Sequence, residues 1–446
     1  MQVTPGDSRP AASQTVTMKI PARSLVALTV LAVLGGTTLS AATFHVATTG
    51  KDDASGAAEA PFASVARAVS KAAPGDTILL HGGTFTNSAT IQLTNSGTVA
   101  APIRLWAAPG EKPVLCFKGW WPADEKIRGA ARGIFLGGDG WHLKGLEICH
   151  SADNAVKIEG SHNIVEHCVL HHNGDSGVQV GLAKKSVNDG SKAATNLVLN
   201  CDSFRNFDPG TKGENADGFA CKLFPGAGNK FIGCRAWENA DDGWDLFMTT
   251  HAVLIERCWA WHNGDSALFV SATNKYNGDG NGFKLGGQNQ PASHVVRNCI
   301  AFGNTPGNGF EDNNNDAPIS LQNCTAWGNG TNLEFKKFPH VIQNCVVFDP
   351  VRPRQDAKLE PMVVSDHNSW APEPKKPTKF ISFATRADFI SLDVALAAAP
   401  RQPDGSLPEN SFARLKPGSA LIDKGVEVGQ PFAGAAPDLG AFEFKP

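Results

Sequence analysis

Three aspartates lie close together in the segment NADDGWDLF, residues 239–247. Asp241, Asp242 and Asp245 fall within five residues, beside a glycine and a tryptophan. Carboxylates this close repel one another or raise each other's pKa values unless their charge is compensated. The segment could be a solvated turn, a catalytic carboxylate pair or a cation site. The elements that hold these residues must decide between the three.

The composition favours an all-β protein. The chain has 446 residues, with 46 glycines, 28 prolines and 19% charged residues, and few long amphipathic helix patterns. Its formal net charge is −3, and it has no basic tail or stripe. We therefore expect no nucleic acid partner.

The first 42 residues have the anatomy of a secretory signal. Lys19 and Arg23 precede the apolar run SLVALTVLAVL (24–34), and small residues follow up to residue 42. The run is short for a membrane span. This predicts a secreted or periplasmic protein, with a retained N-terminal anchor as the alternative.

Residues 1–17 lack such a pattern, so Met18 is a candidate true start. After removal of residues 1–42, we expect residues 43–446 to form a single domain. It should be a monomer without membrane contact.

Ten cysteines in an exported protein would ordinarily suggest disulfides. Their surroundings indicate a repeat instead, as in GCRAWEN (233–239) and RCWAWHN (257–263). Seven cysteines share one repeat position: Cys168, Cys201, Cys234, Cys258, Cys299, Cys324 and Cys345. Three positions later come His171, Phe204, Trp237, Trp261, Phe302, Trp327 and Phe348. Five positions after the cysteine stand Asn173, Asn206, Asn239, Asn263, Asn304 and Asn329.

The spacing of this repeat predicts a parallel β-helix. Successive cysteines are 33, 33, 24, 41, 25 and 21 residues apart, which is typical of a solenoid with loop insertions. Equivalent residues would then stack about 4.8 Å apart. We expect the aligned cysteines to be core packing, neither catalytic nor metal-binding. The distance between adjacent coils would allow a disulfide, but side chains in register point the same way and fit its torsion poorly. The aromatic residues should form a ladder, and the asparagines a second ladder at a corner.

A second repeat follows the asparagines. Segments such as DGFAC (217–221), DGWDL (242–246) and NGFKL (281–285) align on a glycine. Strand alternation then directs Val180, Cys221, Leu246 and Leu285 inward. It directs Gln179, Ala220, Asp245, Lys284 and Glu311 outward, where we expect solvent.

The two ends differ from the repeat. An apolar stripe over Phe62, Val65, Ala66 and Val69 predicts a short helix that caps the solenoid within residues 43–85. Beyond about residue 350 the period fades, so residues 350–446 should form an irregular last coil or cap.

The register of the second repeat brings charged residues together. Asp217, Asp242 and Asn281 share the position before the glycine, and Asp245 shares its position with Lys284. Four carboxylates, including Asp241, should therefore converge beside one lysine. Ca²⁺ suits such a set, because it takes 6–8 oxygen ligands. Mg²⁺ needs stricter geometry, and soft metals prefer Cys or His.

Lys284 could form a salt bridge only, or it could act as a general base. A lysine beside a cation that holds a substrate carboxylate suits β-elimination across a uronic acid. The lysine would remove the C5 proton, and the C4–O bond would break. Lys222 shares the outward face and could contact a substrate carboxylate.

Three other features of this region receive simpler interpretations. Lys157 and Glu311 are expected to be solvated. The segment EDNNND (311–316) is expected to be an asparagine-rich turn rather than a second calcium site.

Several segments together resemble polysaccharide lyase family 9, the pectate lyase L-like enzymes. They are NADGFACKL (215–223), NADDGWDLF (239–247), RCWAWHNG (257–264), NGFKLGG (281–287) and RNCIAFGN (297–304). The resemblance implies a right-handed parallel β-helix, calcium as cofactor, and an acidic plant cell-wall polysaccharide such as homogalacturonan as substrate. Rhamnogalacturonan or another uronate polymer is the alternative substrate. By this resemblance Asp217, Asp241, Asp242 and Asp245 bind the calcium, and Lys284 is the base.

Two more distant functions stay open on the residues alone. A polygalacturonase-type hydrolase would use aspartates as acid and base. A non-catalytic adhesin would use calcium only for structure.

Overall fold

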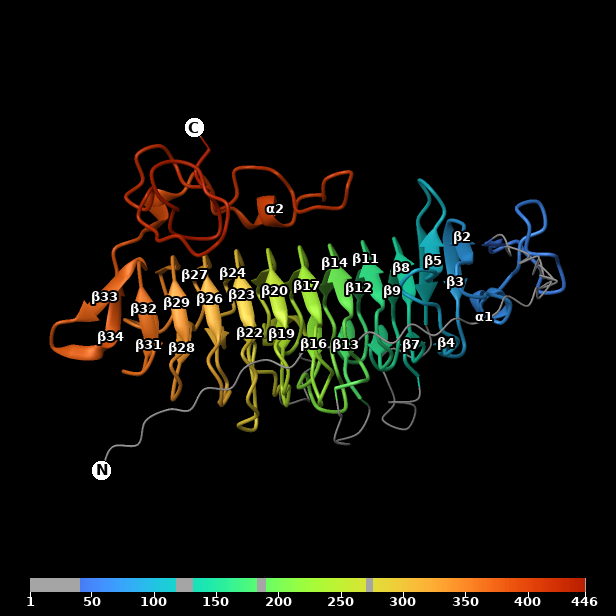
Figure 1. Cartoon of the computed structure of the whole chain (residues 1–446), viewed down its shortest axis with the longest axis horizontal. Helices are drawn as coiled ribbons and strands as arrows, with labels where there is room; N and C mark the ends of the chain where they lie inside the picture. The colour runs from blue at the N-terminus through green and yellow to red at the C-terminus, as the bar shows by residue number, and fades with distance from the viewer. Residues whose placement is uncertain (1–40, 118–130, 183–189, 270–275, 446) are drawn as a thin grey trace, which may run out of the picture. The chain divides into compact units, whose positions relative to one another are not determined.

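The computed structural model describes residues 41–117, 131–182, 190–269 and 276–445 of the chain. Residues 41–446 form one compact unit. The described strands form three sheets, parallel except at the C-terminal end, and the chain visits the three sheets in turn on each coil (Figure 1). This is the predicted parallel β-helix.

Neighbouring strands within each sheet come from successive coils. Sheet 1 contains β1 (Thr43–Val46), β2 (Thr77–Leu80), β5 (Ile103–Ala107), β8 (Trp141–Lys144), β11 (Ile164–Glu166), β14 (Leu197–Leu199), β17 (Lys230–Ile232), β20 (Leu254–Glu256), β23 (Val295–Arg297), β26 (Ser320–Gln322), β29 (Val341–Gln343) and β32 (Val364–Asp366). Sheet 2 contains β3 (Gly83–Thr86), β6 (Pro113–Cys116), β9 (Glu147–Cys149), β12 (Val169–His171), β15 (Asp202–Phe204), β18 (Arg235–Trp237), β21 (Trp259–Trp261), β24 (Ile300–Phe302), β27 (Thr325–Trp327) and β30 (Val346–Phe348). Sheet 3 contains β4 (Ile91–Leu93), β7 (Ile134–Leu136), β10 (Val156–Ile158), β13 (Val178–Val180), β16 (Phe219–Cys221), β19 (Trp244–Asp245), β22 (Phe283–Lys284), β25 (Asn308–Glu311), β28 (Thr331–Phe335), β31 (Ala357–Leu359), β34 (Lys376–Ser382) and β33 (Trp370–Glu373).

Helices are short in the described part of the chain. They are α1 (Val65–Val69), α2 (Val394–Ala397) and the 3₁₀ turns η1 (Ser266–Leu268) and η2 (Arg386–Asp388). Helix α1 packs against β1, β2 and β4 at the first coil. Its buried face is Val65, Ala68 and Val69, whereas Ala66, which we predicted to be buried, is exposed. Phe62, Val65 and Val69 of the predicted stripe are buried, and Ala68 takes the place expected for Ala66.

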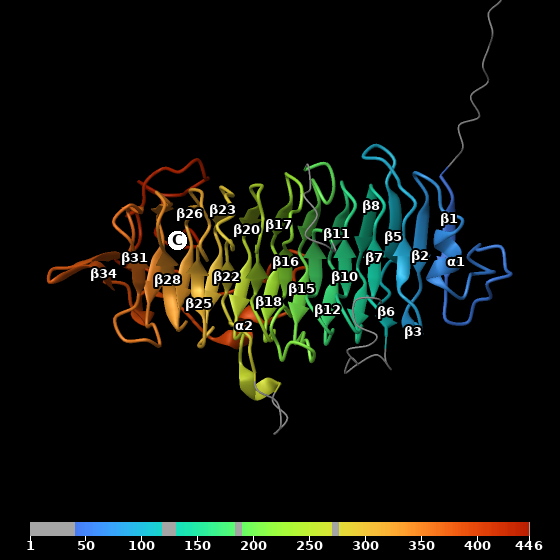
Figure 2. The same ribbon diagram turned by 90° about the horizontal axis from the view of Figure 1, so that it is seen from below.

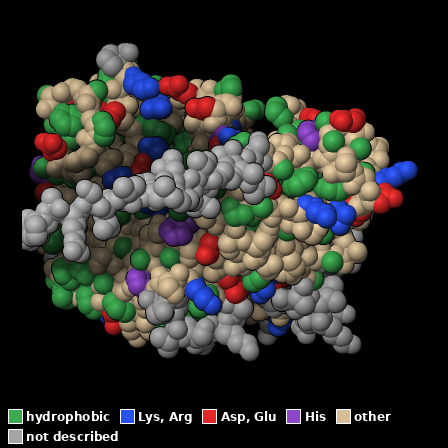
Figure 3. Space-filling view, turned by 45° about the vertical axis from the view of Figure 1, so that its right-hand side comes forward, with side chains coloured by type: hydrophobic (Ala, Val, Ile, Leu, Met, Phe, Trp, Pro, Cys, Tyr) green, Lys and Arg blue, Asp and Glu red, His purple; other side chains and the backbone are tan. Residues whose placement is uncertain are grey.

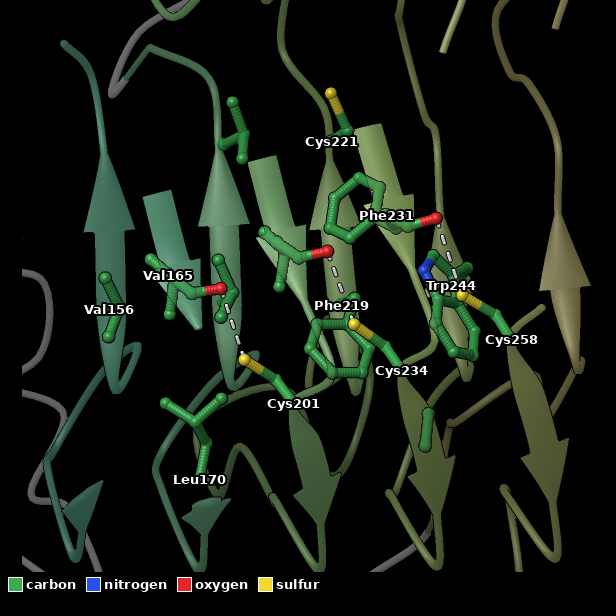
Figure 4. Close-up of a cluster of buried hydrophobic side chains, with 14 of the residues drawn as sticks. Val156, Val165, Leu170, Cys201, Phe219, Cys221, Phe231, Cys234, Trp244 and Cys258 are labelled. Carbon is green, nitrogen blue, oxygen red and sulfur yellow. Dashed lines mark hydrogen bonds between the residues drawn. The ribbon is translucent and has the colours of Figure 1, made fainter. Parts of the chain in front are cut away.

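The aligned cysteines line the interior between sheets 1 and 2. All ten cysteines are free, and the aligned seven are buried as predicted. From Cys201 onward each aligned thiol donates to a backbone carbonyl of the coil below, for example Cys201 Sγ to Val165 O at 3.4 Å and Cys258 Sγ to Phe231 O at 3.5 Å (Figure 4). Weak donation by a small apolar side chain fits the narrow core.

The predicted asparagine ladder is confirmed at the corner between sheets 2 and 3. All six asparagines are fully buried. The side-chain oxygen of each of the upper five accepts from both the backbone N–H and the side-chain amide of the one below, as in Asn239 to Asn263 at 3.1 and 3.0 Å. The ladder satisfies buried backbone donors that the turn leaves without a strand partner.

A second ladder, which the sequence pattern did not reveal, precedes the strands of sheet 1. The backbone N–H of Asn163 donates to Asn196 Oδ1, and both the backbone N–H and the side-chain amide of Asn196 donate to Asn229 Oδ1. Further along, His294 Nδ1 accepts the N–H of Val253 at 3.1 Å, and His340 Nδ1 accepts the N–H of Ile319 at 3.0 Å. In this part of the ladder, coils with an apolar residue (Val253, Ile319) alternate with coils in which a histidine takes the place of asparagine.

The aromatic ladder is confirmed, and it lies on the outer face of sheet 2. Ring centroids are 4.4 Å apart for Phe204 and Trp237, 4.8 Å for Trp237 and Trp261, and 4.6 Å for Phe302 and Trp327. The segment after residue 383 runs back along this face (Figures 1 and 2). It buries Phe389, Phe412, Leu415, Leu421 and Leu439 in one cluster with the ladder.

Residues 350–446 thus do two things. Strands β31 and β32 extend sheets 3 and 1 by a further coil, and the antiparallel pair β33–β34 follows them on sheet 3. The remainder packs along the side of the helix rather than over its end. Its sequence has no period, because its residues pack against the outer face of sheet 2 and do not form coils of the β-helix.

The outer face of sheet 3 corrects two predictions. Gln179, Ala220 and Asp245, expected in solvent, are at most 6% exposed. Lys157, also expected to be solvated, is 1% exposed, and Glu311 is half-buried. Alternation assigns a side chain to a face but does not say whether loops cover that face. The loops after β15 and β21, which lead to this sheet, contact each other through the rings of Phe207 and Phe269.

The charged surface shows no single sign. In Figure 3 lysine and arginine side chains lie among acidic ones without a continuous basic band on that face. Within the described ranges, no helix is long and apolar enough to cross a membrane. The predicted secretory signal lies outside the described residues, except for residues 41–42.

Candidate active site on three adjacent coils

Strands β16, β19 and β22 place the predicted site residues side by side on sheet 3. The predicted register is confirmed, with Ala220 paired to Asp245 and Asp245 to Lys284. On the inner face, the alternate residues Phe219, Trp244 and Phe283 stack with centroids 4.9 and 4.7 Å apart. This stack fixes the coils, so the outward residues keep their positions.

Three of the four aspartates form a tight group at the corner before these strands. Oxygens of Asp217, Asp241 and Asp242 all lie within 4.8 Å of one another. None of the three is more than 2% exposed. Asp245 is 4% exposed and is joined to Asp217 by Lys222. The structure therefore brings all four together.

Backbone N–H groups hold most of the carboxylate oxygens. Asp241 accepts from the N–H of Asn215 at 2.8 Å and of Asp279 at 2.7 Å. Asp242 Oδ1 accepts from the backbone and side chain of Asn281 at 2.7 and 2.9 Å. Asp242 Oδ2 is buried and accepts no hydrogen bond from the described residues. This oxygen lies in an ion pair with Lys284 and keeps lone pairs that a metal ion could use.

Two lysines flank the carboxylates. Lys284 Nζ lies 3.3 Å from Asp242 Oδ2 and 2.9 Å from Asp279 Oδ2. Lys222 Nζ lies 2.7 Å from Asp217 Oδ2 and 3.2 Å from Asp245 Oδ2. Lys222, predicted as a substrate contact, is thus inside the cluster, with its side chain 7% exposed.

Burial dominates the electrostatics of the acids. It raises the pKa of Asp217 and of Asp242 well above the usual carboxyl range, and that of Asp241 to about 6. These carboxylates are costly to ionise in the bare protein, so the site favours an added positive charge.

The pKa values of the two lysines are also raised, but by neighbouring charges rather than by burial. Burial by itself lowers the pKa of Lys284, but the charges of Asp242, Asp245 and Asp241 outweigh it and raise the pKa. The same balance, with Asp217 and Asp245, raises the pKa of Lys222. Both side chains are therefore ammonium groups next to bare carboxylates.

Sequence reasoning missed Asp279 and Ser176. Asp279 belongs to the loop before β22, outside the repeat, and reaches Lys284. Ser176 Oγ donates to Asp217 Oδ2 at 2.9 Å from the coil below. Ser176 precedes the aligned Gly177, so its place in the register was a usable signal. Asp279 offered none, because loops carry no period.

The turn at residues 311–316 is confirmed as an asparagine-rich turn. Asn313 and Asn314 have φ of 41° and 57°, and Asn315 N–H donates to Asp312 O at 2.9 Å. Asp312 pairs with His340 at 3.2 Å, which gives this carboxylate a structural partner.

Comparison with known proteins assigns this chain to a family with the same architecture. The model described as "Pel9A-like, right handed beta helix region" matches residues 44–345. The chain belongs to the Pel9A-like family. Its fold is therefore a right-handed parallel β-helix, and the protein is a polysaccharide lyase. The hydrolase and the non-catalytic adhesin are thereby set aside.

Pel9A-like relatives match along most of their length. Pectate lyase L of Dickeya dadantii (strain 3937) is 36% identical over 412 residues, 90% of this chain and 90% of that protein. Pectate lyase L of Paenibacillus polymyxa (strain SC2) is 39% identical over 371 residues, 81% of this chain and 79% of that protein. The crystal structure of pectate lyase Pel9A aligns with a TM-score of 0.77 at 35% identity, covering 92% of this chain and 98% of that one.

Proposed function

We propose that this protein is a secreted, calcium-dependent lyase that cleaves pectate by β-elimination. Asp217, Asp241, Asp242 and Asp245 would hold the calcium, and Lys284 would be the base. Pectate is the substrate in the names of the relatives above. The observation that carries the proposal is the buried Oδ2 of Asp242, which accepts no hydrogen bond from the described residues and lies 3.3 Å from Lys284 Nζ.

The residues fit calcium in number, type and charge. Four buried carboxylates from two adjacent coils face two lysines, which leaves at least two negative charges in a buried place. A divalent cation would neutralise them, and carboxylate oxygens are its preferred ligands. The group contains no Cys or His, which disfavours softer metals.

Bound there, calcium would hold the uronate carboxylate and stabilise the negative charge that develops when the C5 proton leaves. Lys284 accepts that proton through Nζ, and the electron pair left at C5 forms the C4–C5 double bond as the C4–O bond breaks. The departing oxygen takes a proton from solvent. The amine must be neutral to do this. Because bare Asp242 and Asp245 hold it as ammonium, activity should require that their charge be neutralised.

The surroundings of Lys284 restrict its motion. The Lys284 side chain is 13% exposed. Its Nζ lies 2.9 Å from Oδ2 of Asp279, whose own side chain is largely exposed. The amine therefore has little freedom to move away from the carboxylates. Asp245, one coil below in the same row, keeps the lysine stem in register.

The test follows ultraviolet absorbance of the unsaturated uronate during digestion of polygalacturonate and, separately, of rhamnogalacturonan. We expect absorbance to rise with polygalacturonate and calcium, and to stop after chelation. Lys284→Ala should abolish it. Lys230→Ala, which removes an exposed lysine of sheet 1, is the matched control.

Each other result has a definite meaning. Full activity without calcium, or in Lys284→Ala, contradicts the mechanism. Absorbance with rhamnogalacturonan alone would keep the mechanism and change the substrate. New reducing ends without absorbance would show hydrolysis.

A further inference from the structure

The outer row of sheet 2 changes its chemistry near the N-terminal end. From β12 onward this row is the aromatic ladder that starts at His171 and Phe204. In the two coils before it, the same row carries Cys116 and Cys149, which pair with each other in register. Cys149 in turn pairs with His171. These two cysteines are outside the core row and face away from it.

His150 joins the two cysteines on that face. It directly follows Cys149, and adjacent strand residues ordinarily point to opposite faces. Its left-handed φ of 61° breaks the alternation at the end of β9. As a result, His150 Nδ1 lies 3.7 Å from Cys116 Sγ.

The three side chains have the spacing of a metal site. One donor atom from each of Cys116, Cys149 and His150 lies within 4.8 Å of the others. In a tetrahedral zinc site, with Zn–S near 2.3 Å and Zn–N near 2.0 Å, sulfur and nitrogen are about 3.6 Å apart. The separation of Cys116 Sγ and His150 Nδ1 matches this value.

We propose that Cys116, Cys149 and His150 form a binding site for Zn²⁺ or a similar borderline-soft transition metal ion, separate from the calcium site. Two thiolates and a neutral imidazole balance the charge of a divalent ion. Three protein ligands leave the fourth position to water. Binding proceeds with loss of the two thiol protons to solvent, and no oxidation is involved.

The surroundings support ligation rather than plain packing. The two thiols are buried, at 7% and 4% exposure, so they are shielded from other reagents. Beside Cys149, His171 Nε2 lies 3.2 Å from Glu147 Oε1, so this second imidazole has a carboxylate partner of its own. Elsewhere the core thiols bond backbone carbonyls, whereas Cys116 faces an imidazole.

Cobalt is the probe for this site. The reduced, chelator-treated full-length protein would be titrated with Co²⁺ in the presence of excess calcium. We expect one equivalent to bind with thiolate-to-cobalt charge-transfer absorption, and Zn²⁺ to displace it. Cys116→Ser, Cys149→Ser and His150→Gln should each remove or strongly shift this absorption. Cys221→Ala, a core cysteine of sheet 3, is the matched control and should retain it.

The same preparation separates this site from the calcium site. Asp242→Asn should leave the cobalt absorption unchanged. His150→Gln keeps both thiols and serves if a cysteine variant does not fold. Absence of the charge-transfer band in the reduced wild-type protein would overturn the proposal. So would a native Cys116–Cys149 disulfide, seen as two fewer titratable thiols than the ten in the sequence.

Discussion

Charge balance at single residues decides what the site can do. Lys222 and Lys284 each bridge acids from two different positions, and Asp242 Oδ2 accepts no hydrogen bond from the described residues. Buried ions of one sign that outnumber their partners are unfavourable. Without a cation, the carboxylates therefore repel one another, and binding of a cation would reduce this repulsion.

Asp242→Asn tests the ligand role directly. It removes the charge of a buried carboxylate whose lone pairs a metal ion could use, so we expect the calcium concentration for half-maximal activity to rise by at least about tenfold. The calcium-induced rise in Tm should shrink in parallel. Asp53→Asn, at an exposed position, should change neither. Unchanged calcium dependence in Asp242→Asn would remove this residue from the ligand set.

Lys222→Ala distinguishes two roles for this lysine. Without it, Asp217 and Asp245 lose their shared counter-ion, and breaking a buried pair costs roughly 3–5 kcal/mol. We expect a lower Tm without calcium and recovery of most of the loss when calcium is added. If Lys222 instead acts only as a substrate contact, KM rises and Tm stays the same.

At the scale of elements, the ladders set the distances between coils. The asparagine ladder was predictable because the same residue recurs at a fixed offset from each aligned cysteine. The ladder of sheet 1 was not, because Val253 and Ile319 interrupt it and the histidines do the bonding. Where an apolar residue such as Val253 occupies the ladder position, its backbone N–H still needs an acceptor, and the sequence pattern does not show this need.

Asn263→Ala tests the first ladder. Its side-chain oxygen accepts two hydrogen bonds from Asn239 at 3.1 and 3.0 Å. Leaving buried donors unsatisfied costs about 1–3 kcal/mol per group, so the midpoint of urea unfolding should fall. Asn87→Ala, near the first coils and outside the ladder, is the comparison. Equal midpoints in the two variants would contradict a role for the ladder in stability.

His294 makes the second ladder sensitive to acid. Burial lowers its pKa to about 3, whereas an unfolded histidine has a pKa near 6.5. The unfolded chain therefore binds the proton more readily, so stability is complete above the unfolded pKa and falls as the pH drops towards 3. From about pH 7.5 to about pH 5 the loss is about 2 kcal/mol.

Unfolding of His294→Asn at both pH values measures this effect. Asparagine fills the same position in three earlier coils, so the variant should lose less stability on acidification than the wild type. His162→Asn, an exposed histidine, should behave like the wild type. Equal acid sensitivity in all three proteins would rule His294 out as the cause.

For the whole molecule, the repeat predicted the β-helix, but it did not predict which of its faces are covered by loops and by the C-terminal segment. Cysteine and asparagine spacing gave the coil register, and with it the meeting of Asp245 and Lys284. The burial of Lys157 and Gln179 could not be read, because it depends on loops without a period. The path of the C-terminal segment was hidden for the same reason, although its apolar residues fill the outer face of sheet 2.

Phe412→Ala tests how far the C-terminal segment supports the helix. The ring is 1% exposed, with centroids 5.2 Å from Trp259 and 5.3 Å from Phe302. Truncating such a side chain costs about 3–5 kcal/mol, so Tm should fall and tryptophan fluorescence should shift to the red. Phe432→Ala, at 42% exposure, is the control. An unchanged Tm in Phe412→Ala would mean that the segment is only loosely attached.

The asparagine ladder also separates the length of a coil from its height. Between successive asparagines of the ladder the chain runs for 24 to 41 residues, yet the bonds from asparagine to asparagine stay between 2.8 and 3.3 Å. Each coil is thus a module of constant thickness with a loop of free size. New loops could reshape what the enzyme recognises while leaving its reacting atoms where they are, so in this fold specificity and chemistry can evolve independently.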